Sequence, residues 1–165
     1  MTRRPAAIAT ATAFALASLL VSTAADAATS CSVTATGPVF GVYTAGTAAP
    51  LDANGSLAVT CTLLSGGTTT VTPEVQLSAG SSGTFQPRTM LSGTQKLNYN
   101  IYWSTAYAQI WGDGTGGSFY GTATLTLSPQ APTQQATGVL YGQIAAAQDP
   151  APGSYSDTIV VTVTY

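Results

Sequence analysis

The sequence has 165 residues, of which 45% are apolar and only 6% are charged, and it contains no histidine. This charged fraction is about a quarter of the usual one for a soluble domain, but the many β-branched and aromatic residues are unlike those of a disordered chain. With four cationic residues in all, the chain lacks the basic surface that nucleic-acid binding needs. The composition therefore indicates one β-rich domain and excludes a nucleic-acid-binding protein.

The first 27 residues have the pattern of a signal peptide. Arg3 and Arg4 form a positive start, a stretch of small and apolar residues follows, and Ala25-Asp26-Ala27 fits the small-x-small cleavage rule. A membrane anchor is the alternative, but the stretch is short and rich in alanine, and no later run is long enough to span a bilayer. We expect a cleaved signal peptide at 1–27 and an exported domain at 28–165 with no membrane span.

Two cysteines, Cys31 and Cys61, remain after the expected cleavage. In an exported chain an even number of cysteines is most simply paired in a disulfide. A metal site is disfavoured because there is no histidine and no CxxC spacing, and a catalytic thiol would need a histidine to activate it. We therefore expect a structural bridge, no metal and no cofactor.

Short segments of alternating apolar and polar residues follow one another along the chain, separated by turns rich in glycine and proline. The segments expected to be extended are 31–36, 39–43, 56–62, 71–78, 97–103, 119–127, 139–145 and 155–165. Asn54-Gly55 is the strongest two-residue turn signal, and Pro73 predicts an edge or a bulge. Seven or eight short strands without helical periodicity predict an all-β sandwich at this length.

The last segment has the clearest alternation in the sequence. One face carries Tyr155, Asp157, Ile159, Val161, Val163 and Tyr165. The other face is formed mainly by threonines. Such a strand has one side on a core, and if its edge is left bare it must pair with a partner.

Few residues are suited to catalysis. Without histidine or a free thiol, the remaining design is a pair of carboxylates, as in glycosidases. The carboxylates after residue 27 lie in turns, at a strand start or beside proline, so we do not expect an enzyme. Among the aromatic residues, Tyr99 and Trp103 share an apolar face and are expected in the core, whereas Tyr102 and Tyr107 are candidates for a surface aromatic patch that binds sugar.

An ordered set of segments spans nearly the whole chain after residue 27. These are Cys31, Phe40–Tyr43, Gly55–Cys61, Arg88–Met90, Leu97–Tyr102, Trp111–Gly114, Tyr141–Ile144 and Gly153–Tyr165. In this set the chain resembles the spore coat protein U domain family, which includes the subunits of archaic, Csu-type chaperone–usher pili.

The resemblance implies an immunoglobulin-like sandwich that lacks its final strand and is completed by donor-strand complementation, in which a strand of another protein adds to the sheet. Tyr155, Ile159, Val161, Val163 and Tyr165 would then form one wall of the acceptor groove. The implied partners are a periplasmic chaperone, an outer-membrane usher and other pilus subunits. The implied location is the cell surface, in a fimbrium that serves adhesion and biofilm formation.

One departure from the family pattern concerns the residues before the first cysteine. Polymerising subunits carry a longer donor segment there, whereas only Ala28-Thr29-Ser30 would follow the expected cleavage site. We therefore expect a tip, terminal or minor subunit that accepts a strand. The alternatives are a secreted spore or cyst coat protein that forms no fibre and, from another class, an extracellular carbohydrate-binding domain.

Overall fold

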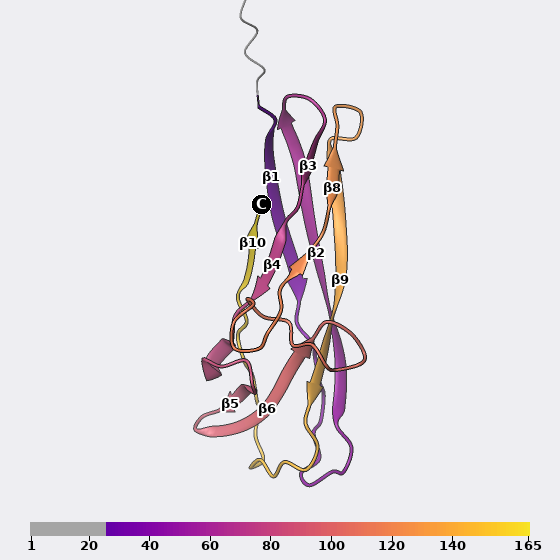
Figure 1. Cartoon of the computed structure of the whole chain (residues 1–165). Helices are drawn as coiled ribbons and strands as arrows, with labels where there is room; N and C mark the ends of the chain where they lie inside the picture. The colour runs from indigo at the N-terminus through magenta and orange to yellow at the C-terminus, as the bar shows by residue number, and fades with distance from the viewer. Residues whose placement is uncertain (1–25) are drawn as a thin grey trace, which may run out of the picture.

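The computed structural model describes residues 26–165; the expected signal peptide lies outside this range except for its last two residues. The described chain is built of strands and one short 3₁₀ turn, Gly80–Ser82 (Figure 1). The strands are β1 (Ala28–Thr36), β2 (Leu51–Ser65), β3 (Thr69–Val71), β4 (Glu74–Leu77), β5 (Arg88–Ser92), β6 (Gln95–Tyr102), β7 (Gly121–Thr122), β8 (Leu125–Leu127), β9 (Thr133–Ile144) and β10 (Val161–Thr164).

The strands form two layers, as in an immunoglobulin-like sandwich. One layer is a five-stranded sheet in the order β1-β2-β9-β6-β5, and the other consists of β10-β4-β7 and β3-β8. Figure 1 shows the long strands β1, β2 and β9 running side by side. The core between the layers includes Leu57 and Val59 of β2, Leu140 of β9 and Leu127 of β8, all of them buried. The all-β fold class predicted from the sequence is confirmed.

The predicted turn at Asn54-Gly55 is wrong, because β2 continues through these residues. Asn54 and Gly55 are paired with Tyr141 and Leu140 of β9. A side chain at Gly55 would collide with the backbone of the chain leaving β1 at Thr36. Glycine is therefore needed here for a close approach between two segments of backbone, which is its other common role in a strand.

The segment expected as one strand at 119–127 is two strands, β7 and β8. The same break occurs on the partner side, where Thr72-Pro73 separates β3 from β4. Proline cannot donate a ladder hydrogen bond, and the Pro73 carbonyl accepts a long bond of 3.3 Å from the Ala123 amide. The interruption predicted from Pro73 therefore extends to the neighbouring chain.

Two further expectations differ from the structure. Residues 39–43 form no strand, and their Val39 and Val42 side chains are strongly exposed. Trp103, expected in the core, is 43% exposed. The regular strand β6 ends at Tyr102, so Trp103 lies at the edge of the sandwich, where its ring rests on that of the buried Trp111 with centroids 4.4 Å apart.

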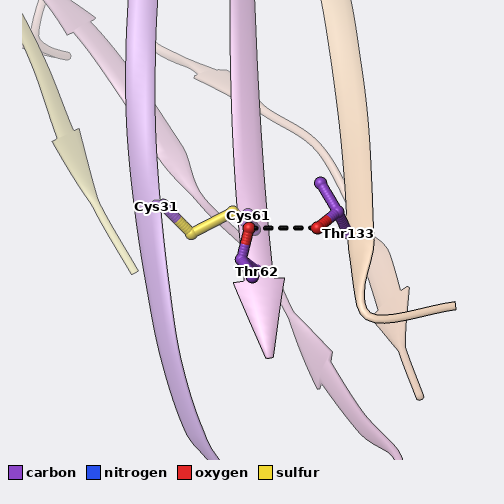
Figure 2. Close-up of a disulfide and its surroundings, with 4 residues drawn as sticks. All are labelled: Cys31, Cys61, Thr62 and Thr133. Carbon is purple, nitrogen blue, oxygen red and sulfur yellow. Dashed lines mark hydrogen bonds between the residues drawn. A yellow bond between two sulfur atoms is a disulfide. The ribbon is translucent and has the colours of Figure 1, made fainter. Parts of the chain in front are cut away.

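The expected disulfide between Cys31 and Cys61 is confirmed (Figure 2). The two cysteines are direct partners in the ladder between β1 and β2. Beside them, the hydroxyls of Thr62 and Thr133 form a hydrogen bond of 3.2 Å between β2 and β9. At this level three adjacent strands are thus connected by side chains as well as by backbone.

Candidate functional site: an open cleft beside the last strand

A cleft of about 1040 Å³ opens along the segment that leads into β10. One side is the irregular segment 37–45, and the other is 150–161. The floor is formed by Leu77, Met90, Leu97, Tyr99, Ile101, Leu140 and Ile144. All of these belong to the hydrophobic core, so the cleft reaches the interior of the sandwich.

The alternation predicted for the last segment is present. The side chains of Tyr155, Asp157, Ile159, Val161 and Val163 are half-buried, and those between them are exposed. Tyr155, Ile159 and Val161 line the cleft, whereas Val163 packs against the core beyond it. Tyr165 was expected on the same face, but it is 55% exposed and does not line the cleft.

The backbone of this segment has one paired edge and one open edge. The Ser78 amide donates to the Val160 carbonyl, and the Val160 amide donates to Ser78 Oγ, both at 2.9 Å. Alternate residues of an antiparallel strand direct their N–H and C=O groups to opposite edges, so those of Ile159, Val161 and Val163 point away from β4. No strand within residues 26–165 pairs with that edge.

Asp157, the single polar residue of the apolar face, is fixed by four hydrogen bonds. Its Oδ1 accepts from the Ser81 amide, Ser81 Oγ and the Thr158 amide, and its Oδ2 accepts from Tyr99 OH at 2.7 Å. Partial burial acts to raise the pKa of Asp157, but the hydrogen bonds outweigh it and hold the pKa below its usual value. Burial, followed by the Asp157 contact, raises the pKa of Tyr99 far above its usual range. The cleft wall is therefore tied to the floor by an ionised carboxylate.

Arg88 lies behind this wall and is fully buried. Its guanidinium donates to the Ser78 carbonyl, the Trp111 carbonyl and Asn100 Oδ1 over 2.7–3.0 Å. Burial away from water lowers the pKa of Arg88. The guanidinium also lies over the ring of Phe85, with Cζ 5.0 Å from the ring centroid. The sequence alone assigned no role to Arg88. The available signal was a charged residue inside a segment that is otherwise suited to burial, because a buried charge needs hydrogen-bond partners.

Tyr102 and Tyr107, the expected surface aromatic patch, do lie together. Their rings meet edge to face with centroids 5.4 Å apart, and both side chains are half-buried. Tyr107 has φ of 51°, a left-handed conformation that costs an L-residue about 1–2 kcal/mol. The patch lies outside the cleft.

The described part of the chain has no helix long and apolar enough to cross a membrane. Residues 26–165 also contain no group of three or more potential metal ligands. The site consists of apolar side chains, an open strand edge and satisfied polar groups, an arrangement suited to binding another polypeptide.

Comparisons with known proteins agree with this architecture. Residues 15–162 match the family model described as Spore Coat Protein U domain. Protein U of Myxococcus xanthus is 34% identical over 115 residues, which cover 67% of this chain and 59% of Protein U.

A similar fold occurs in the crystal structure of the CsuC-CsuE chaperone-tip adhesion subunit pre-assembly complex from archaic chaperone-usher Csu pili of Acinetobacter baumannii. The TM-score is 0.53 at 22% identity, over 84% of this chain and 40% of the matched one. This chain therefore spans less than two thirds of the length of either protein.

Proposed function

Because the chain belongs to the spore coat protein U domain family, we propose that it is an exported structural subunit whose cleft is completed by a strand of another protein. The observation that carries the proposal is that Ile159 and Val161 present both an open backbone edge and apolar side chains to one cleft. An added strand would hydrogen-bond to the edge and place alternate side chains on the apolar floor.

Within this proposal the assembly is a chaperone–usher pilus. The solved neighbour, a chaperone–subunit complex of such pili, supports a periplasmic chaperone as the first donor and another subunit as the second. An outer-membrane usher and a final position at the cell surface, in an adhesive fibre, follow from the same assignment.

We place the subunit at a tip, a terminus or a minor position in the fibre. Residues 28–30, the only ones between the expected cleavage site and Cys31, are already paired with β2 in the subunit's own sheet. They are therefore not free to enter a neighbour. Sequencing the exported protein from its N-terminus tests this point, and a mature chain that begins well before Ala28 would contradict it.

The strand-accepting role is tested by hydrogen exchange on the exported protein, isolated alone and with a periplasmic chaperone of a chaperone–usher system. We expect the amides of Ile159 and Val161 to exchange rapidly in the protein alone and to become protected in the complex. Amides of β2, an inner strand paired on both sides, serve as the control and should be protected in both. A protease-resistant monomer in which the β10 edge is already protected would overturn the proposal.

A second candidate is a secreted coat protein of spores or cysts that forms no fibre, and the description of the matched family as a spore coat protein domain favours it. Immunogold labelling of intact cells and of spores separates the two functions. Label along surface fibres supports the pilus subunit, and label confined to a continuous coat supports the coat protein.

A further inference from the structure

A cluster of tyrosines and polar groups lies on the outer face of the five-stranded sheet, opposite to the cleft. Tyr102 of β6 is the ladder partner of Tyr141 in β9, and Asp52 of β2 is the partner of Gln143. Directly opposed residues of antiparallel strands project from the same face. Since Leu140 and Ile144 of β9 face the core, the odd-numbered residues between them face outward.

The loop after β6 adds Tyr107 to this face. Its ring packs edge to face with that of Tyr102. In an edge-to-face pair one ring contributes only its edge, so the partner ring covers neither of its two faces. We call Tyr102, Tyr107 and Tyr141, with Asp52 and Gln143, the tyrosine patch. It joins three strands and a loop that are distant in sequence.

The backbone at Tyr107 indicates that the aromatic side chain itself is needed. Its φ of 51° is taken easily by glycine or asparagine but rarely by a bulky residue. The amide of Tyr107 closes a turn on the Ser104 carbonyl at 3.1 Å, which glycine would do equally well. Strained conformations of this kind concentrate at binding sites.

The polar groups of the patch can recognise hydroxyl groups. Gln143 Nε2 donates to Asp52 Oδ1 at 2.9 Å, and a carboxylate with about four lone-pair sites, together with the side-chain amide oxygen of Gln143, can accept further hydrogen bonds beside the rings. The Asp52 carboxylate lies close enough to Tyr107 that, after burial, it is the main cause of the raised pKa of that phenol. Aromatic faces with a few convergent hydrogen-bonding groups are typical of small-ligand sites.

The charged residues near the tyrosine patch limit the class of ligand that it can bind. The two cationic residues after the expected cleavage site are Arg88, buried in the core, and Lys96, at the far end of β6 beside Leu91 of β5. The patch thus has a carboxylate and no cation to balance an anionic ligand. A sugar ring fits these features, because its C–H face stacks on an aromatic ring while its hydroxyls bond to carboxylate and amide oxygens.

We propose that the tyrosine patch binds an uncharged sugar unit of a polysaccharide. The proposal is independent of strand acceptance, since the patch and the cleft lie on opposite faces of the sheet.

The test is saturation-transfer NMR and calorimetric titration of the exported protein with cello-, manno-, xylo- and chito-oligosaccharides, and with oligogalacturonate as the anionic comparison. We expect at least one neutral series to bind and oligogalacturonate not to bind. Tyr107→Gly should weaken binding at least tenfold while the melting temperature stays the same or rises, because glycine relieves the backbone strain. Asp52→Asn, which keeps the side-chain shape, should weaken binding severalfold.

Tyr120→Ala is the matched control, because Tyr120 is 43% exposed and lies outside the tyrosine patch; it should bind as the unmodified protein does. The absence of binding to every neutral series would overturn the proposal. So would binding that Tyr107→Gly leaves within twofold, or a preference for oligogalacturonate.

Discussion

At the scale of single residues, Arg88 connects three parts of the chain through one guanidinium group. Its hydrogen bonds all go to neutral oxygens: two carbonyls and the side chain of Asn100. In the core these acceptors have no water to replace a lost donor, so the cost of removing Arg88 exceeds the value of the bonds themselves.

We therefore expect Arg88→Met, which keeps much of the volume, to lower the free energy of unfolding by about 3 kcal/mol. Lys96→Met, at an exposed position in the neighbouring strand, should change it by less than about 0.5 kcal/mol. Urea unfolding of both variants measures the difference, and a loss below about 1 kcal/mol in Arg88→Met would show that the acceptors find other donors.

Asp157 makes the stability of the protein depend on pH in the acid range. Its folded-state pKa lies below the usual 3.8, so the stability that it contributes is present above the unfolded pKa and is lost as the pH falls through the folded one. Asp157→Asn should therefore lower the melting temperature at neutral pH, by a modest amount since the group is partly exposed, and the difference from the unmodified protein should shrink below pH 3.8.

Tyr99→Phe provides the matched comparison for Asp157. It removes one donor to the carboxylate and leaves the charge, so it should shift the acid transition to higher pH without abolishing it. The measurement is the melting temperature of the unmodified protein, Asp157→Asn and Tyr99→Phe as a function of pH in the acid range. Parallel curves for the three would show that Asp157 does not cause the acid dependence.

At the scale of elements, alternation was a reliable guide, whereas the strongest turn signal, Asn54-Gly55, was misleading. The buried faces of β2, β4 and β6 and the half-buried face of 155–163 follow from period-two patterning, because a strand cannot change faces without breaking its pairing. The turn at Asn54-Gly55 was wrong because pairing on both sides of β2 overrides local preference. The burial of Arg88 depends on acceptors from Ser78, Asn100 and Trp111, which are distant in sequence, and the exposure of Trp103 depends on where β6 ends; alternation alone records neither.

The assignment of faces in the last segment can be tested by a pair of neighbouring substitutions. Val161→Asp would place a charge in the apolar cleft and should abolish recovery of the exported protein. Val160→Asp is the control, because Val160 is 59% exposed on the opposite face, and it should be recovered normally. The amount of each protein in the periplasmic fraction is the measurement; equal recovery of the two would reverse the faces.

The disulfide gives a prediction for the first sheet. The cysteines are separated by 30 residues. A cross-link of this span lowers the entropy of the unfolded chain, which stabilises the folded protein by roughly 3–4 kcal/mol in the loop-closure treatment. Cys31→Ala with Cys61→Ala should lower the free energy of unfolding by up to that amount, and reduction of the unmodified protein should have the same effect. If the reductant lowers the stability of the double variant as well, the loss has another cause.

At the scale of the whole molecule, the sandwich has an apolar cleft on one side and a tyrosine patch on the other. The cleft could not be foreseen from strand patterning, since an unpaired edge leaves no mark on the alternation of side chains along a strand. The expectation of an acceptor groove came from the family resemblance. In the structure, the cleft and the open strand edge at Ile159 show where such a groove would lie.

The cleft should bind a hydrophobic dye such as anilinonaphthalene sulfonate while the protein is alone. Bound fluorescence should fall when a complementing strand is present, because both compete for the same apolar floor. Tyr107→Gly, on the outer face, should leave the dye signal unchanged. Dye binding that persists in the complex would place the exposed apolar surface elsewhere.

The bridge between Cys31 and Cys61 also determines how the molecule would bear mechanical load. A pull on Ala28 reaches the bridge after three residues and passes into β2. This strand is the longest of those described, with 15 residues, and is paired with β1 on one side and β9 on the other. The bridge therefore keeps β1 from peeling off β2 at the level of Cys31.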